Sequence, residues 1–275
     1  MIEFRNVSYV YEREEKAIDD VSFKIDNGEF VGIIGHTGSG KSTLIQMMNG
    51  LIKPQSGKVF YNGEDIFGKD YDLRRLKFKV GLVFQYPEYQ LFESSVLKDV
   101  AYGPENKGLD KDSALKAARE SLGLVGLPEE KYEKSPFELS GGEKKRAAIA
   151  GILAMEPEML VLDEPAAGLD PKSRKQLFML LKSLQKEKNI TIVVVSHSME
   201  DMAKYAEHIL VMNNGRLAMD GDARKIFLDY RSLEKIGLAA PKAAYLMAEL
   251  KSRGLPVDTN IITMEEALRC LGTLL

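Results

Sequence analysis

A glycine-rich segment near the N-terminus could bind phosphate groups. Its residues fit the pattern G-x-x-x-x-G-K-S/T: Gly35, His36, Thr37, Gly38, Ser39, Gly40, Lys41 and Ser42. Glycines allow successive backbone N–H groups to converge on phosphate oxygens, and the start of the following helix adds positive potential. We expect Lys41 to reach the outer phosphates and the Ser42 hydroxyl to bind Mg²⁺. The segment therefore predicts nucleotide binding rather than a chance glycine turn.

Two further residues of this segment are assigned by position. His36 occupies a free position of the pattern, so we interpret it as part of the binding loop without a catalytic role. Thr43 follows Ser42 directly and is counted with the nucleotide-binding residues.

Two adjacent acids follow a short apolar run at residues 159–162. Asp163 is placed to hold the coordination shell of Mg²⁺, and Glu164 to polarise an attacking water. An acid pair at a strand end could be only a helix cap, but the phosphate loop upstream favours the chemical interpretation. A small-molecule kinase needs no water-activating Glu, since it activates a substrate hydroxyl. The pair therefore favours hydrolysis of the nucleotide over phosphoryl transfer.

A histidine ends another apolar run, at residues 193–197. The ends of parallel strands line the ligand crevice in sheets of this type. We therefore expect His197 to contact the terminal phosphate or the attacking water. A lone histidine is more often structural, and only the neighbouring motifs give this one a catalytic role.

The elements that position these residues follow an α/β pattern. Residues 31–35 form an apolar run that leads into the loop, and helical spacing follows the loop. Continuous apolar runs at 159–162 and 190–195 are typical of strands buried on both faces of a parallel sheet. The leucine spacing within residues 171–188 predicts the helix that joins two such strands.

Other segments predict elements around this core. Residues 2–4 and 21–25 alternate apolar and polar side chains, as half-buried antiparallel strands do. A mostly helical stretch, with a helix over residues 110–123, separates the first buried strand from the second. We interpret this stretch as an inserted subdomain.

The C-terminal part after residue 229 has a separate helical character. Pro241 opens one helix, and Thr263 with Glu266 forms a capping-box pattern before another. One apolar stripe runs along this last helix: Met264, Leu268, Leu271 and Leu275. Packing against the chain's own domain and contact with a partner are equally open.

Composition excludes several classes of protein. The 275 residues carry 38 Lys and Arg against 41 Asp and Glu, and a net charge of −3 gives no electrostatic argument for nucleic-acid binding. No apolar run is long enough to cross a bilayer, and no secretory signal is visible, so we expect a cytoplasmic location. The single cysteine, Cys270, cannot form an intrachain disulfide and is interpreted as a packing residue.

A second glycine-rich segment identifies a family. Leu139, Ser140, Gly141, Gly142 and Glu143 place a hydroxyl and two glycines at the start of a helix, a second potential anion site. The segment resembles the signature sequence of ATP-binding cassette (ABC) ATPases. In that family two chains pair head to tail, and each ATP is closed between the phosphate loop of one chain and the signature segment of the other. The resemblance implies ATP and Mg²⁺ as cofactors and a dimer as the working form.

The resemblance covers residues 1 to about 229, with the motifs in the family's order. It implies that Tyr11 stacks on adenine, and that residues 167–170 form a loop crossing the dimer interface. It also implies that Gln85 belongs to the catalytic and magnesium site and links it to a membrane partner. Glu143 departs from the family, where glutamine is more usual, and we expect it to weaken the closed state slightly at most.

The chain resembles one branch of this family more closely, the ATPases of energy-coupling factor (ECF) transporters, which import vitamins and metal ions in prokaryotes. The resemblance rests on residues 84–92, on residues 141–157 and on the helical C-terminal extension. Residues 84–93 resemble the second of two ATPase paralogues, so the resemblance implies a heterodimer with a paralogue, with a homodimer as the alternative.

The same resemblance implies membrane partners. The two ATPases sit beneath a transmembrane coupling protein and a membrane substrate-binding subunit, peripheral to the cytoplasmic face of the membrane. One set of side chains is expected to form a groove for a coupling helix: Tyr86, Tyr89, Leu91 and Phe92. Burial within the helical subdomain is the alternative for these residues.

The sequence therefore predicts an α/β fold with the P-loop NTPase core of an ABC ATPase, an antiparallel β subdomain, an inserted helical subdomain and a short helical C-terminal extension. We expect a nucleotide-binding domain at 1–229, with the helical subdomain at about 86–157, and the extension at 230–275. The alternatives are the ATPase of a conventional importer or exporter, a soluble ABC ATPase without a transport role, and a nucleotide-gated module without useful turnover.

Overall fold

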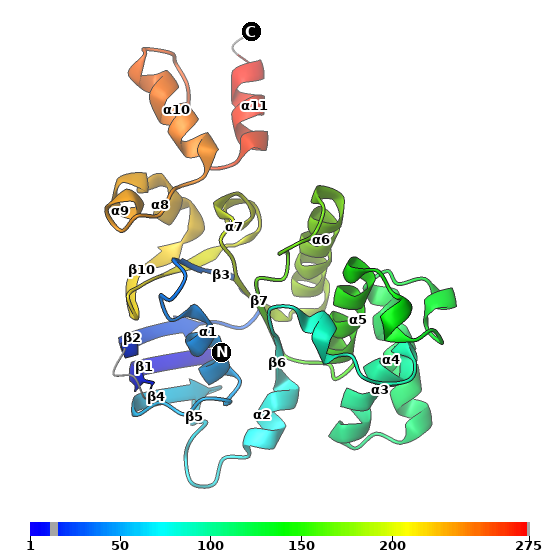
Figure 1. The fold of residues 1–275 in the computed structure, drawn as a ribbon. Coiled ribbons are helices and arrows are strands. Elements are labelled where there is room, and N and C mark those ends of the chain that lie inside the picture. The colour runs from blue at the N-terminus through cyan, green and yellow to red at the C-terminus, as the bar shows by residue number, and fades with distance from the viewer. Residues whose placement is uncertain (12–15, 274–275) are drawn as a thin grey trace.

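Two β-sheets form the centre of the molecule in the computed structural model, which describes residues 1–11 and 16–273 (Figure 1). The larger sheet has the strand order β10-β9-β3-β8-β7-β6. Its strands are β3 (Phe30–Gly35), β6 (Val80–Val83), β7 (Met159–Asp163), β8 (Thr191–Val195), β9 (His208–Asn213) and β10 (Arg216–Asp222). All neighbours in it are parallel except β9 and β10.

Both faces of the larger sheet are covered. Every residue of β3, β7 and β8 is buried, and alternate residues of each strand belong to two different hydrophobic clusters. This explains the continuous apolar runs in the sequence, because a strand buried on both faces has no polar side. The predicted parallel core is confirmed, with β8 beginning at Thr191 rather than at Ile190.

The smaller sheet is antiparallel and has the order β2-β1-β4-β5. Its strands are β1 (Ile2–Val10), β2 (Lys16–Ile25), β4 (Ser56–Tyr61) and β5 (Glu64–Asp65). Its apolar side chains pack in one cluster with α1 (Lys41–Met48) and one face of the larger sheet. The alternation predicted for the first two strands is confirmed.

Helices cover the other face of the larger sheet and extend to one side of it. α6 (Pro171–Lys188) joins β7 to β8, as its leucine spacing predicts. The inserted helices are α3 (Val96–Lys107), α4 (Lys111–Leu124) and α5 (Gly141–Leu153), with short 3₁₀ turns at Pro87–Gln90, Glu129–Lys131 and Pro136–Glu138. Figure 1 shows α3, α4 and α5 packed together beside the sheets. Across the described residues, no helix combines the length and the apolar character that crossing a membrane requires.

Three strands lie within the stretch that the sequence predicts to be mostly helical. β4 and β5 follow α1, and β6 follows α2 (Leu73–Lys79) without an intervening loop. β6 is fully buried at the edge of the larger sheet and pairs with β7. This stretch therefore mixes helices and strands up to β6 and has helices without strands only after residue 86.

Short helices follow β8, and those after residue 229 form the predicted C-terminal extension. α7 (Met199–Tyr205), α8 (Ala223–Leu228) and α9 (Tyr230–Lys235) lie next to the sheets, and α10 (Lys242–Ser252) and α11 (Met264–Gly272) lie beyond them (Figure 1). The predicted capping box at Thr263 is confirmed.

The apolar stripe of α11 divides between packing and exposure. Leu271 and Cys270 pack in a small cluster with α10, which confirms the packing interpretation of the cysteine. Met264 and Leu268 are exposed. Leu275 lies outside the described residues.

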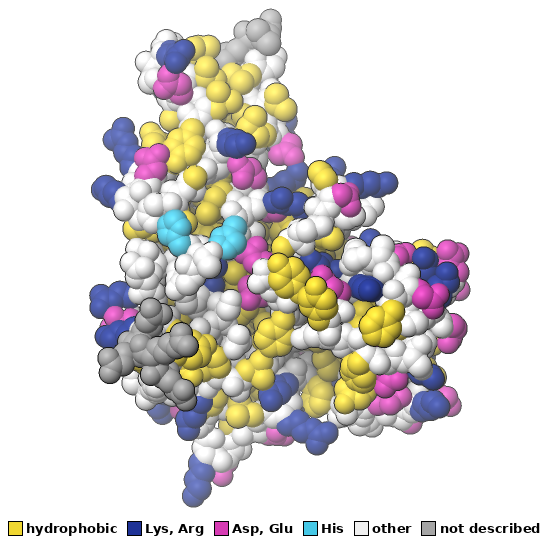
Figure 2. All heavy atoms as spheres, in the orientation of Figure 1, with side chains coloured by type: hydrophobic (Ala, Val, Ile, Leu, Met, Phe, Trp, Pro, Cys, Tyr) yellow, Lys and Arg dark blue, Asp and Glu magenta, His cyan; other side chains and the backbone are white. Residues whose placement is uncertain are grey.

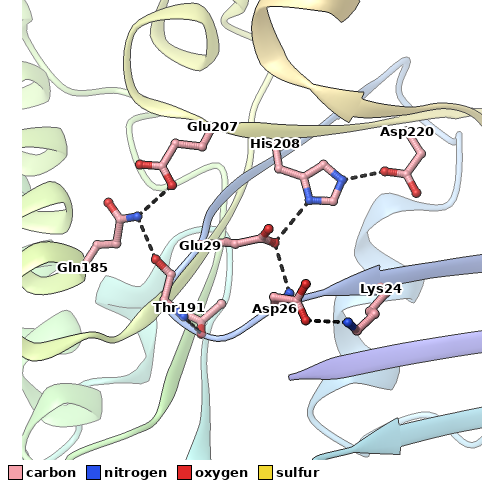
Figure 3. A network of polar contacts seen from close by, with 9 residues as sticks. Lys24, Asp26, Glu29, Gln185, Thr191, Glu207, His208 and Asp220 are labelled. Atoms are coloured by element: carbon pink, nitrogen blue, oxygen red, sulfur yellow. Dashed lines mark hydrogen bonds and ion pairs between the residues drawn. The ribbon is translucent and has the colours of Figure 1, made fainter.

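A polar network connects β3, α6, β9 and β10 (Figure 3). The His208 ring lies between two carboxylates, with Nδ1 3.3 Å from Glu29 and Nε2 2.5 Å from Asp220. Gln185 of α6 donates to the Gly28 carbonyl and to Glu207. These contacts fix the turn before β3, the strand that leads into the phosphate loop.

Candidate nucleotide-binding site

A single cavity of about 1000 Å³ gathers most of the predicted site residues. Those lining it are Tyr11, Thr37, Gly38, Gly40, Lys41, Ser42, Thr43, Gln85, Asp163, Glu164 and His197. They come from both sheets, from the loop between β3 and α1, and from the ends of β6, β7 and β8. Parallel strands end at one edge of the sheet, so residues far apart in sequence meet there.

The phosphate loop has a backbone that its glycines permit. Gly40 adopts φ +100°, and a Cβ at this position would lie 2.3 Å from the Ala17 carbonyl oxygen. Both the left-handed conformation and the close approach of β2 therefore require glycine here. α1 begins at the next residue, so its first N–H groups point into the cavity.

Lys41 is held by the loop itself. Its Nζ donates to the carbonyls of Gly35 and His36 at 2.8 and 2.6 Å and lies 3.4 Å from Ser39 Oγ. Burial lowers the pKa of Lys41, while Glu164 and Asp163 oppose that shift. The ammonium group therefore rests on neutral oxygens that phosphate oxygens can replace.

Ser42 and Asp163 form the part of the site that fits a magnesium ion. The Ser42 hydroxyl donates to Asp163 Oδ2 at 2.9 Å, and burial raises the pKa of this carboxyl. A hydroxyl and a carboxylate are hard oxygen donors of the kind that Mg²⁺ prefers. Gln85 adds an amide group to the wall of the same cavity.

Glu164 and His197 face each other across the cavity. Glu164 Oε1 lies 3.4 Å from His197 Nε2, and this buried oxygen has no hydrogen-bond partner among the described residues. Glu164 adopts φ +47°, and its N–H donates to the Val195 carbonyl. Burial raises the pKa of Glu164 and lowers that of His197. The pair thus places a buried carboxylate oxygen without a hydrogen-bond partner among the described residues beside an imidazole that burial favours in its neutral form.

Tyr11 lies at the rim of the cavity. Its hydroxyl is 3.2 Å from Thr43 Oγ1, and its ring packs edge-on against Tyr9. Tyr11 is 45% exposed and lines the cavity, so part of its side chain is open to a ligand there.

Other predicted binding residues do not line this cavity. Gly35, His36 and Ser39 belong to the loop but are not among the residues that line the cavity. Ser140 and Gly141 are exposed at the start of α5, and Gly142 lines a different cavity of about 220 Å³ between α4, α5 and α6. The chain therefore does not bring its second glycine-rich segment to its own phosphate loop.

Glu143 completes a capping box at this second segment. Its carboxylate accepts from Ser140 N–H at 2.8 Å, its own N–H donates to Ser140 Oγ, and Lys131 lies 3.2 Å from it. The Ser140 backbone contact is the strongest cause that holds the pKa of Glu143 below its usual range. The departure from glutamine thus has a local structural role at the start of α5.

The loop at residues 167–170 is anchored to the same helix. The buried Lys145 donates from Nζ to the Ala167 carbonyl at 2.8 Å. Asp170 caps α6 by accepting from Lys172 N–H and Ser173 N–H. The second glycine-rich segment and this loop therefore lie together.

Some cavity residues have no signal in the sequence. Lys16 and Gln55 line the cavity, and Gln55 exchanges two hydrogen bonds with the backbone of Val10. They come from β2 and from the turn before β4, elements that only the packing of the two sheets brings to the loop. Their isolated polar side chains form no motif.

Comparisons with known proteins agree with this geometry. A family model described as ABC transporter matches residues 18–167. The chain is 52% identical over 271 residues to the energy-coupling factor transporter ATP-binding protein EcfA2 of Clostridium tetani, covering 97% of this chain and 94% of the relative. It is 47% identical over 275 residues to the EcfA2 protein of Clostridium perfringens, covering 98% and 96%.

Solved structures are similar as well. One is cbiO1 from Clostridium perfringens, described as part of the ABC transporter complex cbiONQ, with a TM-score of 0.76, 36% identity and coverage of 90% of this chain and 98% of that one. Another is the ATP-binding cassette MJ0796 as a dimer in a post-hydrolysis state with ADP and Pi, with a TM-score of 0.72, 30% identity and coverage of 81% and 99%.

Proposed function

The chain belongs to the ABC transporter family, among the ATP-binding proteins of energy-coupling factor transporters, and from this premise we propose how it works. It is an ATPase with an energy-coupling role. The observation that carries the detailed proposal is the cavity that joins the phosphate loop to Asp163, Glu164 and His197.

ATP binds in this cavity with its phosphates on the loop. Lys41 turns from the loop carbonyls to the outer phosphates, and the partly exposed Tyr11 stacks on the adenine. Ser42, Asp163 and Gln85 would hold Mg²⁺. When bound, the ion neutralises charge that develops on the phosphate oxygens.

Glu164 and His197 then carry the hydrolysis. The Glu164 carboxylate, which lines the cavity, accepts a proton from the attacking water, and its raised pKa brings its basicity closer to the working range. The neutral His197 donates from Nε2 to the terminal phosphate or to that water. Both side chains act only when water is otherwise excluded, because fixed charges are most effective in a dry site.

The site is composite. Ser140, Gly141 and Gly142 lie outside the chain's own cavity, so a second ATPase chain must bring its equivalent segment to close each ATP. A dimer with a two-fold or pseudo-two-fold axis satisfies this geometry twice. We propose a paralogous chain as the partner, with a second copy as the alternative.

An exposed aromatic surface is proposed to receive the membrane partner. Tyr86, Tyr89 and Phe92 are 50%, 84% and 59% exposed, and Figure 2 shows hydrophobic side chains gathered on this face beside the inserted helices. Asp99 fixes the segment by accepting from the N–H groups of Phe92 and Glu93. Leu91 instead packs against the main core. Exposed aromatic anchors held on a fixed loop suit the docking of an amphipathic helix.

The full proposal is import of vitamins or metal ions by an ECF transporter. ATP closes the dimer at the cytoplasmic face of the membrane, and the motion passes through the Gln85 region to a transmembrane coupling protein and a membrane substrate-binding subunit. Residues 1–229, including a helical subdomain at about 86–157, perform the nucleotide chemistry, and residues 230–275 form the extension.

Affinity purification of the chain from detergent-solubilised native membranes tests this function. We expect a second ATPase, a transmembrane coupling protein and small hydrophobic subunits to be identified by mass spectrometry. A matched purification of Tyr86→Ser/Tyr89→Ser should lose the membrane proteins and keep the second ATPase. Recovery of permeases of a conventional transporter, or of soluble proteins alone, would contradict the ECF assignment and leave the ATPase chemistry standing.

A further inference from the structure

His36 of the phosphate loop contacts the predicted C-terminal extension. His36 Nε2 lies 2.8 Å from the carbonyl oxygen of Ile236, two hundred residues further along the chain. A carbonyl oxygen only accepts hydrogen bonds, so the Nε2 that faces it carries the proton. Figure 2 shows exposed histidine side chains at the surface just below the extension.

The segment that receives this contact, residues 233–238, has a fixed backbone. Gly237 N–H donates to Glu234, and Leu238 N–H donates to Leu233, which closes the C-terminus of α9. Leu233 and Leu238 are both buried in the main core cluster. The Ile236 carbonyl is thus held at a defined place beside the phosphate loop.

Gly237 allows the histidine ring to approach this segment. It adopts φ +76°, and a Cβ here would lie 3.0 Å from His36 Nε2 and 3.4 Å from Cε1. Any larger residue would strain the turn and push the ring away. The contact therefore depends on two residues of the same chain, His36 in the phosphate loop and Gly237 in the extension.

The same histidine also touches the lysine that is to bind phosphate. Its carbonyl accepts from Lys41 Nζ at 2.6 Å and from Ser39 N–H at 3.1 Å. Its side chain, in contrast, does not line the nucleotide cavity. The His36 ring thus contacts the extension, and the His36 carbonyl accepts hydrogen bonds from two residues of the phosphate loop.

We propose that residues 233–238 brace the phosphate loop through His36, which makes His36 a positioning residue for nucleotide binding. Displacement of the extension loosens the loop and weakens its hold on the phosphates. The coupling is reciprocal, so bound nucleotide stabilises residues 233–238 in turn. This inference rests on the proposed function, because it takes the loop to be the ATP site.

The test measures binding of the non-hydrolysable nucleotide AMP-PNP with Mg²⁺ to the full chain by titration calorimetry. We expect His36→Ala to raise the Kd about three- to tenfold, as the loss of one structural hydrogen bond does. Gly237→Ala should do the same from the other side of the contact. His36→Gln should restore much of the affinity, since its amide can donate to the same carbonyl. Lys235→Ala, exposed on the same segment, is the matched control and should leave the Kd unchanged.

Two further measurements separate bracing from general damage. The double variant His36→Ala/Gly237→Ala should bind no more weakly than either single variant, because both remove one contact. Hydrogen exchange at residues 233–238 should slow when nucleotide binds to the wild-type chain and not to His36→Ala. The proposed brace would be overturned by any of three results. These are unchanged Kd values in both single variants, additive effects in the double variant, and a hydrogen-exchange rate at residues 233–238 that nucleotide does not change. A wild-type chain that binds no nucleotide would instead overturn the proposed function.

Discussion

Glu164 is the side chain on which the proposed hydrolysis depends most directly. Its Oε1 is buried, has no hydrogen-bond partner among the residues described, and lies 3.4 Å from His197 Nε2. We expect Glu164→Gln to lower steady-state ATP hydrolysis at least 100-fold, because the amide keeps the shape and cannot take a proton. Binding of Mg²⁺–ATP should be unchanged, and an ATP-bound dimer should accumulate, as seen by size-exclusion chromatography.

The other end of the same strand offers the control. Glu158 precedes β7 and pairs with Tyr61 and Lys79, away from the cavity. Glu158→Gln should keep normal hydrolysis. Normal turnover in Glu164→Gln would show that the base lies elsewhere.

Glu143 allows a prediction about stability at the residue scale. It caps α5 through Ser140 and pairs with Lys131. We expect Glu143→Ala to lower the free energy of unfolding by about 1 kcal/mol, because the N–H of the N-cap residue Ser140 loses its acceptor. Glu143→Gln keeps an acceptor oxygen and should cost less than half of that. Urea denaturation measures the free energy of unfolding of both variants. Equal losses in the two would mean that the ion pair with Lys131, rather than the capping box, stabilises the chain.

The residues of the phosphate loop could be predicted because their chemistry is local. Eight consecutive residues contain the whole phosphate-loop pattern. The apolar periodicity on either side of them predicts the strand before the loop and the helix after it. Lys16 and Gln55 line the same cavity and could not be predicted, since they arrive through the packing of one sheet on the other. The contact between His36 and Ile236 is of the same kind, because it joins residues that no sequence pattern relates.

Strand β6 is an element that the hydrophobic periodicity of the sequence does not predict. It has four residues, all buried, and begins directly where α2 ends. A short apolar run after a helix cannot be told from one more helical turn, because no turn residue separates them. Only the pairing of Val80–Val83 with β7 makes this segment a strand. Gln85, which follows it, reaches the cavity through that pairing.

The polar network behind β3 gives a pH-dependent prediction. Glu29 and Asp220 flank the His208 ring, and the contact with Asp220 is the strongest cause that raises the pKa of His208 above 6.5 (Figure 3). A raised folded-state pKa means that the stabilisation is complete below the unfolded pKa and is lost as pH rises through the folded one. His208→Gln should therefore destabilise the chain by about 1 kcal/mol near pH 6 and by less near pH 9.

Thermal unfolding across this pH range measures the difference between wild type and variant. Asp220→Asn is the matched control, because it removes a charged partner and keeps the histidine. The pH dependence of stability should be weaker in that variant. If the stability lost in His208→Gln grew with rising pH, the positive charge assigned to the His208 ring would be contradicted.

At the scale of the whole molecule, the decisive feature is the separation between the two glycine-rich segments. One ends β3 and opens into the cavity, whereas the other begins α5 and lies outside it. Lys145 of α5 connects the helix that begins at the second segment to the loop at residues 167–170. In the proposed dimer, each chain therefore gives half of its own ATP site and half of its partner's.

This division predicts that two changes in one chain disable different sites of the dimer. In the complex with a paralogous ATPase, Lys41→Ala should remove trapping of a photoreactive ATP on this chain, because the loop loses its cation. Ser140→Arg should instead lower trapping on the partner about tenfold or more, since in the proposed closed dimer the exposed Ser140 would face the partner's phosphates. Labelling each chain during turnover and separating the two by electrophoresis distinguishes the cases. Loss of label on this chain in Ser140→Arg, with the partner unaffected, would mean that each chain closes its own ATP site.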